Sequence, residues 1–212
     1  ITFSVISAWQ FPIFFTLSVI GFVVVQLSYS LWLKHLILID VMAIAATFSL
    51  RVFAGAFILP VPLSAWLILT TVALALLLAI GKRRAEITLL THAIAAKHRV
   101  VVSHYPAVLL DGMTFVMAAA TLMSYALFTF NQPELTTRKK LIDLLPQTLA
   151  SPKWMMITIP FVIYGIFRYL YVIYEKKEGS SPERVLIYDF PLLASVLAWA
   201  VAAYFAIYIV TK

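Results

Sequence analysis

Long apolar runs separated by short polar clusters are the main feature of this chain of 212 residues. A helix that crosses the hydrocarbon core of a bilayer needs about 20 mostly apolar residues. An apolar stub at 1–8 is too short for that. The pattern predicts an all-α, polytopic transmembrane helical bundle. Its six complete spans are expected near 12–33, 36–58, 64–81, 107–129, 154–174 and 190–210.

Prolines mark the ends of these runs. A proline is tolerated best in the first turn of a helix, where its missing N–H has no intrahelical partner to lose. The link at 59–63 is too short for a separate domain, and the chain has no internal repeat or low-complexity tract. We therefore expect one membrane domain over 1–212. The prolines at or next to predicted ends are Pro12, Pro60, Pro62, Pro106, Pro152 and Pro191.

The composition excludes a soluble globular domain. Hydrophobic residues make up 63% of the chain and charged residues 12%, whereas ordinary soluble domains have about 45–50% and 25%. The mean hydropathy of +1.00 agrees with this. No regular alternation typical of a membrane β-barrel runs through the chain. A disulfide framework is excluded as well, because there is no cysteine.

The net charge of +7 comes from short basic clusters between the apolar runs. Such clusters are typical of the cytoplasmic loops of membrane proteins, and they favour a membrane over nucleic acid as the partner. Placing alternate loops on opposite sides gives nine cations against five, and the richer side is expected in the cytoplasm. The nine are Lys34, Lys82, Arg83, Arg84, Lys97, Arg99, Lys176, Lys177 and Arg184; the five are Arg138, Lys139, Lys140, Lys153 and Lys212.

The predicted cytoplasmic loops 82–106 and 175–189 hold most of the mixed polar chemistry, so an active site would open to the cytoplasm. The segment that begins Lys82-Arg83 follows Gly81 directly. If the helix continues there, Lys82 and Glu86 lie on one face at i,i+4. The alternative is a simple topology anchor with a surface ion pair.

Asp40 and Arg51 are the charges least expected within a span. Arg51 follows Asp40 by eleven residues, so both lie on nearly the same face of the helix. They are about 16 Å apart along the helix axis, which is too far for a direct ion pair. An intramembrane arginine is a functional candidate by default. The structural alternative is a partner for a buried carbonyl or for Asp111, and we would then expect Arg51→Leu to impair folding more than chemistry.

Aromatic and basic residues gather at two further span ends. Arg168 lies among tyrosines, and Tyr29 and Lys34 end the 12–33 span. An interfacial belt explains such residues, although an arginine there can also hold a phosphate bidentately. The four histidines lack zinc-site spacing, and a GxxxxGK[ST] phosphate loop is missing.

Taken in order, four segments resemble the UbiA superfamily of intramembrane prenyltransferases, and specifically its decaprenyl-phosphate phosphoribosyltransferase branch. They are YSLWLKHLILIDVMAIAATFSLRVFAGA at 29–56, PLSAWLI at 62–68, GKRRAEI at 81–87 and FRYLYVIYEKKEGSSPERVLIYDFPLL at 167–193. The resemblance implies a nine-helix fold around a central cavity, with this chain as its C-terminal two thirds. The family motif NDxxDxxxD, which binds Mg²⁺ and diphosphate, is absent here. The metal ligands are therefore unknown, and we expect the chain alone to be inactive.

The resemblance also implies roles for individual residues. Lys82 and Arg83 would bind a phosphate of phosphoribosyl diphosphate, and Lys34 would contact the diphosphate. Glu86 would orient Lys82 or help a metal ion, with Mg²⁺ as the expected cofactor. The remaining candidates for substrate binding are Tyr29, Asp40, Arg51 and Arg168, the last two as ligands of the lipid phosphate.

The implied reaction moves a 5-phosphoribosyl group from phosphoribosyl diphosphate to a polyprenyl phosphate lipid and releases diphosphate. It would serve cell-wall precursor synthesis at the inner membrane. One alternative is transfer of a prenyl chain from a prenyl diphosphate to an aromatic or other acceptor. A second is a secondary transporter, which the six spans and Arg51 suggest, although no inverted repeat is visible. The sequence leaves the oligomeric state open.

Overall fold

The computed structural model of the protein describes residues 12–58, 63–92, 106–132, 153–176 and 187–209. Over these ranges the chain is helical and contains no strand. Six of its helices are long and apolar enough to cross a membrane. The predicted all-α bundle with six spans is thereby confirmed, while the predicted stub at 1–8 lies outside the described residues.

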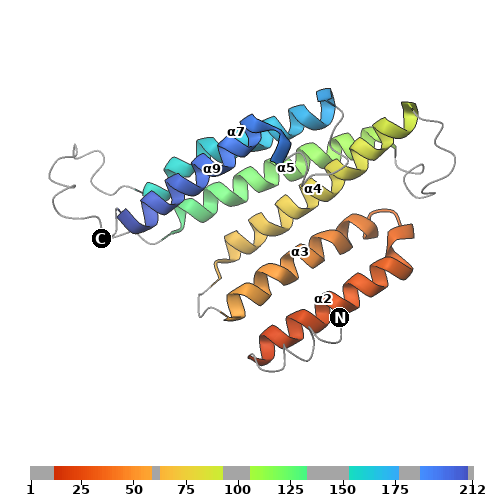
Figure 1. Cartoon of the computed structure of the whole chain (residues 1–212), viewed down its shortest axis with the longest axis horizontal. Coiled ribbons are helices and arrows are strands. Elements are labelled where there is room, and N and C mark those ends of the chain that lie inside the picture. The colour runs from red at the N-terminus through yellow and green to blue at the C-terminus, as the bar shows by residue number, and fades with distance from the viewer. Residues whose placement is uncertain (1–11, 59–62, 93–105, 133–152, 177–186, 210–212) are drawn as a thin grey trace.

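The helical segments follow the predicted spans closely (Figure 1). Four short 3-10 or π-helical turns, η1, η4, η5 and η6, lie at the ends of α-helices. Their bounds, in chain order, are α2 (Ile13–Leu31), η1 (Leu33–His35), α3 (Ile39–Ile58), α4 (Ala65–His92), α5 (Ala107–Phe130), η4 (Trp154–Thr158), α7 (Ile159–Tyr171), η5 (Val172–Lys176), α9 (Phe190–Tyr204) and η6 (Phe205–Ile209).

Prolines open four of these helices. Pro12 and Pro106 are the N-cap residues of α2 and α5. Pro160 and Pro191 lie in the first turns of α7 and α9. In all four places the proline removes no hydrogen bond from the helix interior, so it fixes the start of a span at little cost in stability.

Helix α4 runs further than the sequence pattern indicated. We expected the span to end at 81 and a loop to begin at 82, but α4 continues to His92. Lys, Arg, Ala and Glu all have high helix propensity, so a change from apolar to charged residues does not end a helix. The expected loop start was wrong, and the segment Gly81–Glu86 is helical.

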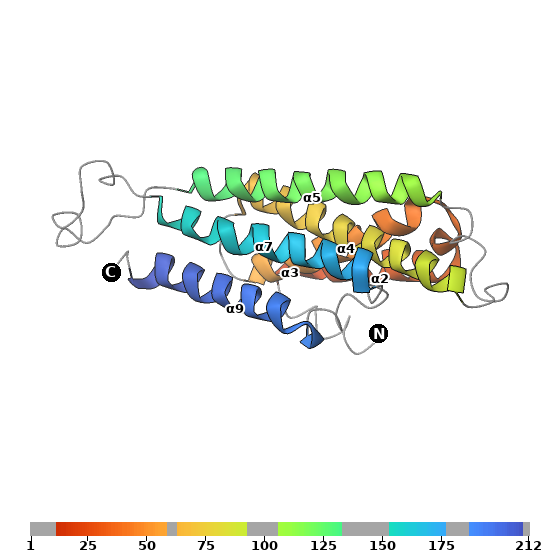
Figure 2. The same cartoon turned by 90° about the horizontal axis from the view of Figure 1, so that it is seen from above.

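Consecutive helices lie side by side: α2 against α3, α3 against α4, and α4 against α5 (Figure 1). The pair α7 and α9 packs together, and α7 also contacts α5, as the view from above shows (Figure 2). Two buried clusters mark these contacts. One joins α4, α5, α7 and α9 around Leu77 and Ile166, and the other joins α3, α4 and α5 around Val41 and Ile80.

Hydroxyl groups within the spans are mostly satisfied by their own helices. The hydroxyl of Thr70 donates to the carbonyl of Trp66, and that of Thr114 to the carbonyl of Leu110, both at 2.7 Å. This is the usual solution for Ser and Thr in an apolar solvent. In the described part of the chain no buried side-chain nitrogen or oxygen lacks a partner. The informative polar groups are those that bond between helices.

Candidate functional site

One guanidinium joins three helices at one end of the bundle. Arg83, on α4, donates from Nε to Oδ2 of Asp40 on α3 at 2.7 Å. Its Nη2 donates to the Tyr29 hydroxyl on α2 at 3.0 Å, and its Nη1 to Oε2 of Glu86 at 2.6 Å. Arg83 is 2% exposed and Asp40 1%. Each partner satisfies a different donor of this buried guanidinium, so loss of one acceptor leaves a buried N–H without a hydrogen bond.

The structure therefore brings together four of the predicted site residues, but not in the predicted pairs. The i,i+4 spacing assigned the carboxylate of Glu86 to Lys82, whereas this carboxylate accepts from Arg83 instead. Asp40, for which we expected a place at a substrate site, is a partner of Arg83. A position on one helix face is no guarantee of a contact when a third helix offers a closer partner.

A second ion pair lies one residue further along α4. Arg84 Nε donates to Oδ1 of Asp111 on α5 at 2.5 Å, and the hydroxyl of Tyr174 in η5 donates to the same oxygen at 2.9 Å. The guanidinium of Arg84 also lies 5.5 Å from the centre of the Tyr174 ring. These side chains are about a quarter exposed, in contrast to the Arg83 group. They connect α4 to α5 and to the end of the α7 span.

Arg168 is also engaged by a carboxylate. Its Nε and Nη2 bind the two carboxylate oxygens of Asp189, each at 2.9 Å. Asp189 is the N-cap of α9 and also accepts from the backbone N–H of Leu192 at 3.1 Å. The fork that we expected to hold a lipid phosphate thus holds α9 against α7. This geometry favours a structural role for Arg168.

Two lysines at this end stand apart from these pairs. Lys82 is half-buried and lies on α4 between Gly81 and Arg83, and Lys34 is half-buried in η1. Neither ammonium group has a hydrogen-bond or ion-pair partner among the described residues. Because a half-buried ammonium keeps its charge and its donors, these lysines are the cations best placed to bind an added anion.

Gly81 allows the basic segment to approach α7 closely. A Cβ atom at this position would lie 2.6 Å from the hydroxyl oxygen of Tyr169 and 2.7 Å from Cδ1 of Ile173. Real Cβ atoms do not come that close to other heavy atoms. The glycine therefore sets the packing of α4 on the α7 span directly beside Lys82.

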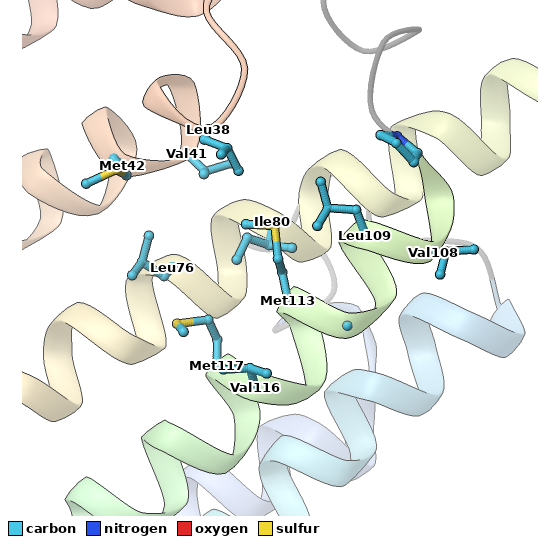
Figure 3. A pocket seen from close by; sticks show the side chains of 12 residues that line it. Leu38, Val41, Met42, Leu76, Ile80, Val108, Leu109, Met113, Val116 and Met117 are labelled. Carbon is cyan, nitrogen blue, oxygen red and sulfur yellow. The ribbon is translucent and has the colours of Figure 1, made fainter.

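An apolar groove of about 860 Å³ lies next to this polar end, between α3, α4 and α5 (Figure 3). Val41, which follows Asp40, and Ile80, two residues before Lys82, both line it. Three methionines add side chains that adapt easily to a flexible ligand. The groove is thus an apolar surface that begins beside a charged network. Its lining includes Val41, Met42, Leu76, Ile80, Met113 and Met117.

Arg51 lies apart from the polar network. It is exposed on α3, with its guanidinium 5.0 Å from the Phe22 ring centre and 5.4 Å from that of Phe48. Asp111, one of the partners considered for it, binds Arg84 instead. The prediction that Asp40 and Arg51 have different partners is confirmed, but Arg51 does not line the groove described above.

Arg84 and Asp189 were not singled out from the sequence as site residues, and Asp111 was considered only as a possible partner of Arg51. Arg84 was counted only as a topology signal, although it lies beside Arg83 in the same basic cluster. Asp111 has a signal of its own, since a carboxylate within a span needs a partner. Asp189 precedes Phe190-Pro191 as an N-cap precedes a first turn with proline.

The residues of this site do not form a metal centre. In the described ranges no group of three or more His, Cys, Asp or Glu side chains is placed to hold an ion. The carboxylates of Asp40, Glu86 and Asp111 instead accept from guanidinium groups. The expected magnesium ion therefore stays a prediction, and we assign no step of a reaction to it.

No family model matches the chain, but individual proteins do. It is 32% identical over 192 residues to the decaprenyl-phosphate phosphoribosyltransferase of Corynebacterium glutamicum. This match covers 90% of this chain and 54% of that protein. The protein of the same name from Mycolicibacterium smegmatis is 30% identical over 197 residues, and that from Mycobacterium tuberculosis 26%. Each of these matches covers 92% of this chain and 59% of the relative.

The chain thus spans between 54% and 59% of the length of these curated relatives. The matched part includes nearly all of the segments on which the resemblance rested, since 90% or more of the chain is aligned. These matches confirm the resemblance seen in the sequence: the chain is a homologue of the decaprenyl-phosphate phosphoribosyltransferases, the branch of the UbiA superfamily that its four segments resemble.

Proposed function

We propose that the protein transfers a 5-phosphoribosyl group from phosphoribosyl diphosphate to a polyprenyl phosphate lipid. The observation that carries this proposal is the position of an apolar groove beside a network of charged side chains, since both lie on α3 and α4. An anionic head and a long hydrocarbon chain are the two parts of a polyprenyl phosphate. The relatives are named decaprenyl-phosphate phosphoribosyltransferases, and we take phosphoribosyl as the transferred group from these names.

The chemistry requires charge stabilisation more than a protein nucleophile. The bond between the anomeric carbon and the diphosphate oxygen breaks, and an oxygen of the acceptor phosphate forms the new bond to that carbon. Negative charge develops on the departing oxygens. Preorganised cations at such a position are typically worth about 3–4 kcal/mol each. Among the residues that the structure describes, Lys82 and Lys34 are the cations proposed for that role.

The groove provides the place for the lipid chain. Its wall changes from apolar to charged within two residues on α4, from Ile80 to Lys82, and within one on α3, from Val41 to Asp40. A polyprenyl chain in the groove therefore brings its phosphate to the charged end. The seated chain covers apolar side chains of α3, α4 and α5.

The reaction is tested with the full-length protein in membranes, using phosphoribosyl diphosphate labelled in the ribose and a polyprenyl phosphate. We expect label in the lipid fraction and one released diphosphate for each lipid formed. If ribose label never enters the lipid while a prenyl diphosphate is consumed with an aromatic acceptor, the protein is a prenyltransferase and the proposal is wrong.

We also propose that the charged end faces the cytoplasm, as the nine-to-five distribution of cations indicates. Ala95→Cys and Ser180→Cys fall in the loops predicted from the sequence and lie outside the described residues. Each reports alone because the chain has no cysteine. A membrane-impermeant maleimide should modify them only after the cells are permeabilised, and Lys212→Cys should react in intact cells. Modification of position 95 or 180 from outside would reverse the orientation.

A further inference from the structure

The basic segment of α4 directs its side chains to different neighbours. Gly81 contacts the α7 span, Arg83 binds α3 and α2, and Arg84 binds α5. Among the described residues only Lys82 of the segment's three cations has no polar partner. A topology anchor would leave all its charges toward water and lipid headgroups, whereas here two of three arginine and lysine side chains are held by carboxylates.

Arg83 is poorly placed to bind an anion itself. It is 2% exposed, and three of its nitrogens already donate to Asp40, Glu86 and Tyr29. A phosphate could reach it only by displacing a carboxylate from a buried charge, which is costly in a low-dielectric site. Its donors instead determine where α2 and α3 lie relative to α4.

The hydrogen bond between Arg83 and Tyr29 is the informative contact. Helix α2 packs on α3, and α3 on α4, but this bond links α2 to α4 directly. Tyr29 lies in the last turn of α2, five residues before Lys34 in η1. Lys82 is the residue before Arg83. The bond therefore connects the two backbones that carry the two available lysines.

We propose that Arg83 is a positioning residue that acts through Tyr29 and Asp40 to hold Lys34 and Lys82 at one diphosphate-binding site. This inference deepens the proposed function, since it names which cations contact the anion and which residue places them. The ligand is an anion with at least two phosphate oxygens to share between two ammonium groups. A positive charge at position 83 is not enough to hold this arrangement. The planar guanidinium is needed, because its separate N–H donors reach three acceptors at once.

The test measures binding of inorganic diphosphate to the purified full-length protein and needs no turnover. Tyr29→Phe removes only a hydroxyl, and we expect it to weaken diphosphate binding roughly tenfold. In a Lys34→Ala background the same change should have little further effect, because Tyr29 acts through the placement of Lys34. Such non-additivity separates positioning from a general loss of structure.

Two other variants complete the experiment. Arg83→Lys keeps the charge but loses the fork, and it should bind diphosphate as weakly as Tyr29→Phe or more so. Tyr125→Phe removes a buried hydroxyl from the other end of the bundle, between α5 and η4, and should leave diphosphate affinity unchanged. The inference is wrong if Tyr29→Phe binds diphosphate like the parent. It is also wrong if the losses of binding free energy from Tyr29→Phe and Lys34→Ala add fully in the double variant.

The readout also distinguishes this inference from the proposed function. Coupled loss of diphosphate binding without formation of phosphoribosyl lipid would support the positioning role and reject the proposed reaction. Formation of phosphoribosyl lipid by a Tyr29→Phe, Lys34→Ala protein at the rate of the parent would do the reverse.

Discussion

The two ends of the bundle join their helices by different chemistry. At one end, the buried guanidinium of Arg83 on α4 binds the carboxylate of Asp40 on α3 and the hydroxyl of Tyr29 on α2. At the other end, the Tyr125 hydroxyl lies 2.5 Å from that of Thr158 and accepts from the indole N–H of Trp199 at 2.6 Å. These neutral groups connect α5, η4 and α9. Asp111 and Tyr125 on α5 place the ends about 21 Å apart.

The difference indicates which end holds a ligand. The neutral network satisfies its own donors and acceptors and needs no further partner. The charged end includes Lys34 and Lys82, which have no ion-pair partner within the described part of the chain. Ionised groups are costly inside a membrane unless they serve a substrate pathway or a specific pairing. Within the described ranges, the charged end has the specific pairings of Arg83 and Arg84, and it also has two lysines that could each bind an added anion.

The largest effect is expected at the most buried pair. Asp40→Ala leaves the Nε donor of Arg83 without its acceptor at a residue that is 2% exposed. We expect a loss of about 3 kcal/mol or more in the free energy of unfolding, because an unpaired donor on a buried charged group is costly. Asp111→Ala is the matched control, because its ion pair with Arg84 is partly exposed and should cost about 1 kcal/mol or less. Unfolding in detergent measures both. Equal losses would show that burial does not distinguish the two pairs.

The next effect concerns activity. In the full-length protein, Lys82→Ala should reduce turnover of the proposed reaction by about 10²–10³ with little loss of folded protein, because it removes one cation from the negative charge that this reaction would develop. Lys153→Ala is the control at the opposite end, where the ammonium donates to the carbonyl of Phe130. Activity of Lys82→Ala within twofold of the parent would reduce the basic segment to an anchor.

Glycine substitutions separate packing from charge. Gly81→Ala introduces a Cβ that overlaps Tyr169 and Ile173, and overpacking of this kind costs about 1–3 kcal/mol. Gly55→Ala on α3 meets nothing within 4 Å and should be neutral or slightly stabilising, since alanine is the better helix former. If both variants unfold at the same temperature as the parent, α4 and α7 are not in the close contact described here.

The spans could be predicted from the sequence because length and hydropathy are properties of a single segment. The run expected at 107–129 is observed as Ala107–Phe130, for example. The end of α4 could not be predicted in this way, because leaving the apolar core and leaving the helix are separate events. Composition reports the first, whereas propensity and packing decide the second.

The pairing of charges could not be predicted for a different reason. Arg83 lies 43 residues from Asp40 and 54 from Tyr29, and no spacing rule connects residues on different helices. The sequence shows only that Asp111 needs a cation, and Arg51 and Arg84 were both available to it. Helix packing makes the choice. Lys82 and Glu86 lie on the same continued helix, as expected, but the carboxylate of Glu86 pairs with Arg83, which lies within reach of it.

At the end of the bundle that holds Tyr125, Thr158 and Trp199, a mutation should lower the free energy of unfolding without changing substrate binding. Tyr125→Phe leaves the indole N–H of Trp199 without its acceptor, and an unpaired donor of this kind costs about 1–2 kcal/mol when it is partly buried. The KM for phosphoribosyl diphosphate should stay that of the parent. A rise in KM would mean that the two ends are coupled and that the comparison between them does not hold.

The smallest effect is expected for Arg51, although the sequence alone suggested a folding defect for Arg51→Leu. Arg51 is exposed and contacts only the rings of Phe22 and Phe48 among the described residues. Exposed cation–π contacts are worth about 0.5–1 kcal/mol, and leucine at a membrane-facing position offsets part of that loss. We therefore expect Arg51→Leu to change the free energy of unfolding by less than about 1 kcal/mol, with normal extraction and a monodisperse product. Arg51→Lys keeps the positive charge but removes the planar guanidinium, so it separates the effect of the charge from that of the contact with the two phenylalanine rings. If Arg51→Leu is stable but fails to use the lipid acceptor while Arg51→Lys still does, Arg51 is a charge contact for the lipid phosphate, and ligand binding is not confined to the charged end.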